Sequence, residues 1–230
     1  MEAIVLAGGK AERLGEAAGG RPKSLVLVGG RPLLTWQLER LRRVGVTRVI
    51  VSCLAGQEHE FERELVDLDL EVACAGEPER LGRGGGIRYA ASLRREGGDV
   101  YAMNGDELVD VDFAGLLERQ RSTGAAATVT VARPPSAFGQ VDLTDDDVIT
   151  GFHEVSTVPY WVNCGIYVLS DAALARFPVK GDHETTVFPE LATEGSLRGF
   201  RHEGLWLTVN TPKELKRADE HVAAHPEWLA

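Results

Sequence analysis

The feature that most constrains the fold of this chain is an alternation of short apolar runs with amphipathic segments, repeated four times in the first 110 residues. Short apolar runs are typical of buried strands, and apolar residues at helical spacing are typical of helices. We therefore expect an α/β fold, with a Rossmann-like, mostly parallel sheet covered by helices on both faces. The expected strands are residues 3–7, 48–53, 70–75 and 100–104, and the expected helices are residues 32–44, 57–66 and 88–96.

Two of the expected strands end in residues that suit a binding site. The first runs into Gly8-Gly9, and the fourth runs into Gly105-Asp106. In open α/β sheets, ligands bind in the crevice at the carboxyl ends of the strands. Both features are thus expected on one rim of the sheet.

The second half of the chain reads as richer in strands. No linker separates it from the first half, so we expect a single domain over residues 1–230, with a cleft between its two halves, 1–110 and 111–230. The Asp145-Asp146-Asp147 run predicts a turn between two strands. The expected strands are residues 126–132, 140–143, 148–152, 161–169 and a final pair, 197–202 with 205–210, before a closing helix over 212–224.

Composition excludes several classes of protein. The 25 basic and 35 acidic residues give a net charge of −10, which argues against binding to nucleic acid or anionic lipid. Three scattered cysteines do not form a disulfide framework or a zinc motif. No basic leader precedes the first apolar run, and no 18 consecutive apolar residues occur, so we expect a cytoplasmic protein without a membrane span.

The segment LAGGKAERLG (residues 6–15), followed by RPKS (21–24), predicts a phosphate-binding loop. Glycines let backbone N–H groups approach a phosphate closely, and Arg13 and Lys23 supply two cations. The segment fits neither the P-loop pattern nor the dinucleotide-binding G-x-G-x-x-G pattern. At the next glycine turn, Asp106 is a candidate Mg²⁺ ligand, because Mg²⁺ takes one or two protein carboxylates together with phosphate oxygens.

These motifs, in this order, resemble the sugar-1-phosphate nucleotidyltransferases, and most of all the heptose- and mannose-1-phosphate guanylyltransferases. The likeness continues through GEPERLGRGGGIRYA, FGQVDL, GFHE, VNCGIYVL and WLTVNTPKEL. The resemblance implies a nucleotidyltransferase-type fold with a small β-rich sugar-binding lobe in 111–230 and a nucleotide-binding half in 1–110. It implies transfer of a nucleoside monophosphate from an NTP to a sugar 1-phosphate with Mg²⁺, by a monomer or a homodimer.

The resemblance also implies roles for individual residues. The nucleotide would be bound by Leu6, Ala7, Gly8, Gly9, Glu77, Gly82 and Asp106, and the catalytic residues would be Arg13 and Lys23. The sugar would be contacted by Gly139, Glu154 and Asn163, and the metal would be held by Asp106 and Asn210. Guanine carries two adjacent donors, N1–H and N2–H, and a carboxylate accepts two such hydrogen bonds well. Glu77 therefore favours guanine as the base and hence GTP as the substrate. Uridylyl transfer and transfer from other triphosphates remain open.

Three positions depart from the family pattern. Ala11 replaces a usual glycine, and Val155 replaces a usual lysine that meets the sugar phosphate, a task that Arg133, Lys180 or Arg201 could take over. Thr208 stands where many relatives have an aspartate, and Asn210 fits a different subset. These departures leave open a non-catalytic nucleotide-sensing domain of the same fold. A glycosyltransferase reading depends on Asp110-Val111-Asp112 as a D-x-D motif, although Asp110 and Asp112 are simpler as a surface residue and a helix cap.

Overall fold

A seven-stranded sheet forms the centre of the molecule in the computed structural model, which describes residues 1–136, 138–154, 157–225 and 228. The strands lie in the order β12-β8-β11-β6-β1-β4-β5. Only β11 runs antiparallel to its neighbours in this sheet, so the sheet is mixed and mostly parallel, as expected. Its strands are β1 (Glu2–Leu6), β4 (Arg48–Leu54), β5 (Glu71–Glu77), β6 (Val100–Asn104), β8 (Ala127–Ala132), β11 (Val162–Leu169) and β12 (Leu197–Arg201).

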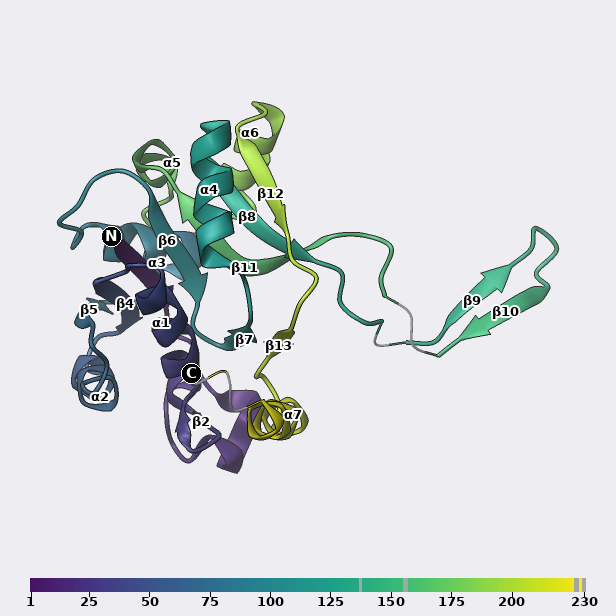
Figure 1. Cartoon of the computed structure of the whole chain (residues 1–230), viewed down its shortest axis with the longest axis horizontal. Coiled ribbons are helices and arrows are strands. Elements are labelled where there is room, and N and C mark those ends of the chain that lie inside the picture. The colour runs from purple at the N-terminus through teal and green to yellow at the C-terminus, as the bar shows by residue number, and fades with distance from the viewer. Residues whose placement is uncertain (137, 155–156, 226–227, 229–230) are drawn as a thin grey trace.

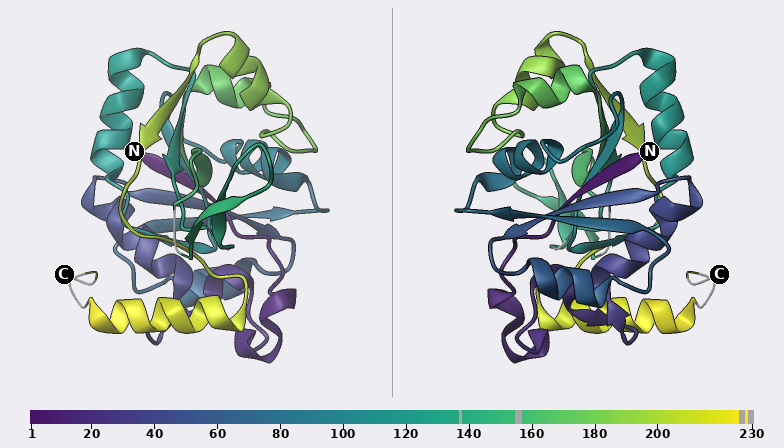
Figure 2. Two further views of the ribbon diagram at one scale, coloured as in Figure 1. Left: turned by 90° about the vertical axis from the view of Figure 1, so that its right-hand side faces the viewer. Right: turned by 90° about the vertical axis from the view of Figure 1, so that its left-hand side faces the viewer.

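Helices cover both faces of the sheet (Figures 1 and 2). One face packs on apolar side chains of α1, α2 and α4, and the other on those of α3, α5 and α6. A third cluster joins α7 to the loop after β1. The helices are α1 (Leu33–Arg43), α2 (Glu58–Glu64), α3 (Gly82–Ala91), α4 (Phe113–Thr123), α5 (Asp171–Arg176), α6 (Val187–Thr193) and α7 (Pro212–Ala224), with 3-10 turns η1 (Glu12–Ala18) and η2 (Lys23–Leu25).

Three small antiparallel pairs complete the fold. They are β2 (Leu27–Val28) with β3 (Arg31–Pro32), β7 (Glu107–Val109) with β13 (Trp206–Thr208), and β9 (Gln140–Leu143) with β10 (Ile149–His153). The expected pairing of the last two strands is wrong, because β12 joins β8 at the sheet edge while β13 joins β7. The β7–β13 pair matters for the site, since it brings Val209 N–H within 3.0 Å of the Asp106 carbonyl oxygen.

Helix α3 begins six residues before the expected start at residue 88. Its first turn contains Gly82 and Gly84–Gly86, which read as a loop because glycine weakens an isolated helix. Here the Gly181 carbonyl accepts the N–H groups of Gly84 (2.9 Å) and Gly85 (3.2 Å). This tertiary contact satisfies the start of the helix, which has no side-chain cap.

The β9–β10 hairpin, residues 140–153, projects from the rest of the molecule and is called the arm below (Figure 1). It is connected to the sheet through β8 and β11. Between sheet and arm, Val158 N–H donates to the Pro134 carbonyl (3.0 Å), and Pro135 and Thr157 form an antiparallel bridge. These four residues, called the stem, extend the β8–β11 ladder outward.

No helix within the described residues has the length and apolar character needed to cross a lipid bilayer.

Candidate active site

One edge of the sheet gathers most of the residues singled out from the sequence. The carboxyl ends of β1, β4, β5 and β6 lie there because these strands are parallel. Strand β11 runs the opposite way, so its beginning, with Asn163, lies at the same edge. Residues from both halves of the chain therefore meet at this rim.

Four polar residues converge over the end of β6. The Lys23 ammonium contacts both the Asp106 carboxylate and the Asn210 amide oxygen, and Arg13 Nη2 donates to the same amide oxygen at 2.9 Å. The Lys23 side chain is nearly buried, with 11% of its surface exposed, while Asp106 keeps 31%. Two cations and two oxygen ligands are thus held together by residues up to 197 positions apart in the sequence.

A cavity of about 360 Å³ opens beside this cluster. Its lining includes Leu6, Gly8, Gly9, Lys23, Glu77, Gly82 and Asp106, together with Ser24, Leu54, Arg80, Arg83 and Asn104. Ala7 is buried and is absent from this lining; its N–H donates to the Ser52 carbonyl (2.7 Å).

Gly8 and Gly9 are not required by the packing of the protein itself. Both lie outside the left-handed region, and a Cβ at either would come no closer than 3.8 Å to any other group. The glycines therefore leave free the space in front of the backbone, where a ligand can approach closely.

Glu77 is buried at the base of the cavity and already has two partners. Ser52 Oγ donates to Glu77 Oε1 (2.6 Å), and Leu81 N–H donates to Oε2 (3.0 Å). Each carboxylate oxygen has a second acceptor site, so the group can still accept two donors from a ligand. The same contacts fix the turn that leads into α3.

A second polar network connects the cavity to Asn163. Arg83, which lines the cavity, donates to Glu184 Oε1 (2.6 Å) and to Asp182. Asn163 Nδ2 donates to Glu184 Oε1 (2.9 Å) and to the Tyr167 hydroxyl (2.8 Å). Both N–H donors of the Asn163 amide are therefore used, and its Oδ1 accepts Gly165 N–H (2.8 Å). Glu184 begins the segment ETTVFPEL, which also resembles the guanylyltransferases, but it was not predicted to be a site residue.

Glu107 was also missed, although it follows Asp106 directly. Burial, and secondarily the charge of Asp106, raise the pKa of Glu107 to about 8. Its oxygens accept only long bonds from Asn104 (3.4 Å) and Trp206 (3.3 Å). Glu107 is therefore mostly neutral at pH 7. Nothing in the local sequence pattern distinguishes Glu107 from a surface glutamate.

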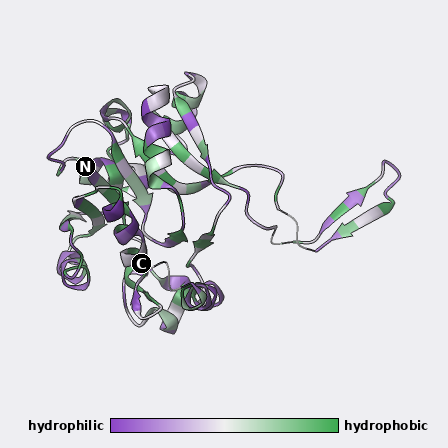
Figure 3. Cartoon of the chain, in the orientation of Figure 1, coloured by the Kyte–Doolittle hydropathy of each residue, from purple (hydrophilic) through white to green (hydrophobic). Residues whose placement is uncertain are grey.

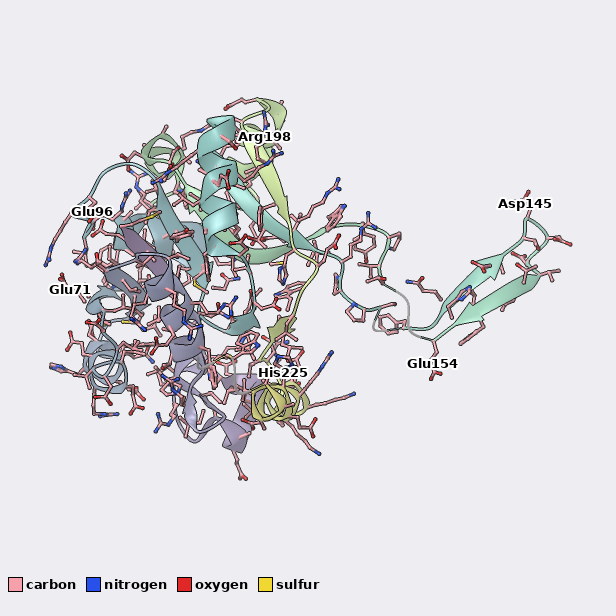
Figure 4. All side chains as sticks on the ribbon, viewed as in Figure 1. Glu71, Glu96, Asp145, Glu154, Arg198 and His225 are labelled. Carbon is pink, nitrogen blue, oxygen red and sulfur yellow. The ribbon has the colours of Figure 1, made fainter. Side chains whose placement is uncertain are left out.

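The proposed sugar contacts are divided between two places. Asn163 lies at the rim, whereas Glu154 lies at the base of the arm (Figure 4) and Gly139 directly precedes β9; both of these residues are exposed. Val155 lies outside the described residues. Of the cations considered as its replacement, Lys180 pairs with Glu79, and Arg133 and Arg201 both lie over the Trp161 ring, at 4.4 and 5.3 Å.

The Asp110-Val111-Asp112 motif serves the fold. Asp112 caps helix α4 by accepting Gly115 N–H (2.9 Å), as expected of a helix cap. Asp110 pairs with His202 (3.1 Å), and this partner contributes to the low pKa of Asp110 despite its partial burial. Both carboxylates are thus already used, which removes the main support for a glycosyltransferase.

The donor set at the rim suits a hard divalent cation. No cluster of three or more His, Cys, Asp or Glu side chains suited to a metal occurs among the described residues. Mg²⁺ does not need one, because it keeps waters and phosphate oxygens as its other ligands. The Asp106 and Asn210 oxygens both contact one cation, the Lys23 ammonium, so they already face a common positive charge. Thr208 instead donates to Glu214 (3.3 Å), which favours Asn210 over Thr208 as the second ligand.

Comparisons of the sequence with known proteins identify its relatives. A family model described as "Nucleotidyl transferase" matches residues 2–225. The chain is 33% identical over 229 residues to the mannose-1-phosphate guanylyltransferase of Mycobacterium tuberculosis, covering 94% of this chain and 63% of that protein. It is 30% identical over 244 residues to the mannose-1-phosphate guanyltransferase beta-A of Xenopus laevis, covering 100% of this chain and 68% of that protein. The chain thus spans about two thirds of the length of these relatives.

Solved structures share the fold. HddC from Yersinia pseudotuberculosis, crystallised with GMP-PN, superposes with a TM-score of 0.74 at 22% identity, covering 96% of this chain and 98% of that one. The inositol-1-phosphate CTP transferase from T. maritima gives a TM-score of 0.72 at 19% identity, with 96% and 94% covered. At these identities the structural likeness supports the architecture alone.

Proposed function

The chain belongs to the nucleotidyl transferase family, and we propose that it transfers a nucleoside monophosphate from an NTP, preferably GTP, to a sugar 1-phosphate, with release of pyrophosphate. The observation that carries this proposal is the convergence of Arg13 and Lys23 on Asp106 and Asn210 beside the glycine-lined cavity. Two anionic substrates can meet there only if their charges are neutralised. The names of the guanylyltransferase relatives support guanine as the base.

The proposed chemistry is a direct displacement at the α-phosphorus. An oxygen of the sugar phosphate forms a bond to that phosphorus, and the bond to the oxygen shared with the β-phosphate breaks, so pyrophosphate leaves. The acceptor is already an anion near neutral pH and needs no general base. We propose that no covalent enzyme intermediate forms, because the acceptor oxygen is itself the nucleophile and Lys23, the lysine of the cavity lining, is engaged by Asp106 and Asn210. A labelled triphosphate should therefore leave no label on the protein.

The chain's own groups supply positioning and charge. The backbone of Gly8 and Gly9 lines the triphosphate site, while Arg13 and Lys23 stabilise the charge that spreads over the transferring group. Asp106 and Asn210 are the residues that would hold Mg²⁺. When bound, this ion neutralises phosphate charge and orients the α-phosphate.

For the base, we propose that Glu77 accepts the N1–H and N2–H of guanine while it keeps Ser52 and Leu81 as partners. For the sugar, we propose that Asn163 and Glu184 form the rim of the acceptor site. No described hydrogen bond or ion pair uses Glu184 Oε2, so this oxygen is available to accept a sugar hydroxyl. Gly139 and Glu154 could contact the sugar only if the arm reaches an active site.

We place the reaction in the cytoplasm, consistent with three free thiols and an NTP substrate.

The decisive experiment is a matrix of four nucleoside triphosphates against several sugar 1-phosphates, with pyrophosphate release as the readout. We expect release with GTP, and loss of release when the metal is chelated. Lys23→Met should lower kcat at least about 100-fold, as is usual for loss of a group that stabilises transition-state charge. Lys10→Met, in the same loop but exposed and paired with Glu12, is the matched control. Binding of GTP without release for every acceptor would instead favour a sensing domain.

A further inference from the structure

The arm has one apolar face and one polar face. Val141 and Leu143 alternate along β9, and their register partners Phe152 and Ile149 lie on the same side. These four side chains are 44–71% exposed. The other side carries Gln140, Asp142 and His153, with an ion pair between Asp142 and His153 (2.9 Å). Such alternation is typical of a strand pair with one covered face. In Figure 3, the strands of the arm carry both hydrophobic and hydrophilic segments.

The arm cannot cover this face by itself. An isolated two-stranded hairpin is at best marginally stable in water, and needs a third strand or a packing partner. The stem continues the β8–β11 ladder outward, and the arm projects away from the sheet (Figure 1). The partner of the apolar face therefore lies beyond this chain's own sheet.

The arm has an acidic tip, and a hollow beside the stem is lined in part by basic residues of α7. Its tip carries Asp145, Asp146 and Asp147, all exposed, and Asp147 adopts the left-handed conformation of the turn. Beside the stem, a hollow of about 870 Å³ lies between Pro134–Ser136, β13 and α7. We call it the α7 hollow. Its lining includes Lys213, Lys216 and Arg217 next to the apolar Trp206 and Leu207.

The α7 hollow has unused positive charge. Lys216 pairs with Glu220 (3.7 Å), and Glu214 is engaged by Thr208 and the backbone of Asn210 and Thr211. Lys213 and Arg217 have no ion pair among the described residues. The hollow therefore suits an acidic hairpin turn with its three carboxylates.

These features fit together in a second copy of the same chain. In a dimer whose two-fold axis is perpendicular to the arms, two arms that pack apolar face to apolar face run antiparallel, so each tip lies beside the stem of the partner. The α7 hollow lies at that point. A parallel arrangement would instead bring six tip carboxylates together. We propose that the chain forms a two-fold dimer in which the arms pack face to face and each acidic tip lies in the partner's α7 hollow.

The first experiment tests the apolar face. Full-length protein should sediment as a dimer at micromolar concentration, and Ile149→Ser with Phe152→Ser should give a monomer that still unfolds in one cooperative transition. Thr150→Ser, on the same strand and also exposed, is the control and should remain dimeric. A wild-type monomer at 100 µM, or a dimer unaffected by the double change, overturns the proposal.

The second experiment tests which surfaces meet. Variant A carries Asp145→Lys and Asp146→Lys, and variant B carries Lys213→Glu and Arg217→Glu. In a dimer of variant A alone, Lys tips would meet basic hollows, and in a dimer of variant B alone, Asp tips would meet acidic hollows. Each variant alone should therefore be monomeric. Mixed one to one, the Lys tip of A meets the Glu hollow of B, and the Asp tip of B meets the unchanged hollow of A, so a heterodimer should form. If A and B stay monomeric when mixed, or if each dimerises alone, the tips do not occupy the hollows. The result is independent of any enzymatic activity.

Discussion

Glu77 illustrates how one carboxylate can serve both the fold and the ligand. Its oxygens bind Ser52 and Leu81, and each has an acceptor site left for the base. Glu77→Gln keeps the size of the side chain but replaces one acceptor with a donor. We expect kcat/KM for GTP to fall about 10- to 100-fold relative to UTP, corresponding to roughly 1–3 kcal/mol for an unpaired buried donor.

A control separates base selection from support of the turn. Ser52→Ala removes one structural partner of Glu77 without changing the carboxylate. It should lower the melting temperature without inverting the preference among the four triphosphates. If Glu77→Gln leaves that preference unchanged, Glu77 does not read the base.

Glu184 makes a prediction about the acceptor. Its Oε1 is fixed by Arg83, Asn163 and Tyr167, and its Oε2 is available. Glu184→Gln should raise KM for the sugar 1-phosphate several-fold while KM for GTP changes little. A deoxy-sugar that lacks the contacted hydroxyl should be a poor acceptor for the wild type, yet no poorer than the parent sugar for the variant. Glu190→Gln, an exposed partner of Arg176, is the control. Equal losses on every deoxy-sugar would indicate a purely structural role.

At the scale of single elements, the first turn of α3 is packed tightly and the β1 loop is not. A Cβ at Gly85 would lie 2.7 Å from the Val179 carbonyl oxygen and 2.8 Å from Leu81 Cβ, which are backbone or short groups that cannot turn aside. Gly85→Ala should therefore destabilise the protein by about 1–3 kcal/mol, measured by chemical denaturation.

Gly9→Ala should fold with normal stability but bind GTP weakly, because its new methyl group faces the ligand and not the protein. Normal GTP affinity in Gly9→Ala would argue against a phosphate close to that backbone.

The segment between α5 and α6 makes stability depend on pH. His183 is fully buried among Tyr167, Phe177 and Phe188, and burial lowers its pKa to about 4. Asp182 opposes this shift and Arg83 adds to it. The unfolded chain takes up the proton near pH 6.5, before the folded chain does, so stability is lost as pH falls from about 6.5 to 4. Protonation of His183 alone lowers the free energy of unfolding by at most roughly 3 kcal/mol over this pH range.

The variant His183→Phe keeps an aromatic ring and removes the titration. We expect its free energy of unfolding, measured by urea titration at several pH values, to vary less between pH 4 and 6.5 than that of the wild type. Neither ring nitrogen has a hydrogen-bond partner among the described residues, so the variant should be no less stable at pH 7. Parallel pH curves for the two proteins would contradict the assignment.

Some elements have the bounds predicted from the sequence, and others do not. Residues 100–104, 140–143 and 212–224 were predicted with the bounds they have, because periodicity or a capping box marks them locally. The start of α3 was not, since the Gly181 carbonyl that satisfies it comes from a distant segment. The cluster of Arg13, Lys23, Asp106 and Asn210 followed from motif order. Glu184 and Glu107 did not, because only tertiary contacts make them unusual.

For the molecule as a whole, the arm should be dispensable for folding. Replacing residues 133–161 with a two-residue Asn-Gly turn joins Ala132 to Val162, which are register partners in the β8–β11 ladder. The shortened protein should be a monomer that melts within a few degrees of the monomeric Ile149→Ser, Phe152→Ser variant and binds GTP normally. If Gly139 and Glu154 contact the sugar, its KM for the sugar 1-phosphate should rise at least 10-fold. Loss of the cooperative melting transition would show that the arm supports the core.

The reversed direction of β11 has one further consequence. The chain leaves the sheet after β8 and returns into β11 at a single rim, so everything inserted between them begins and ends in adjacent positions. Insertions at such a point leave the registers of the seven central strands unaltered. Evolution, or an engineer, could therefore lengthen, exchange or delete this excursion and so change assembly and acceptor choice while the triphosphate chemistry stays fixed.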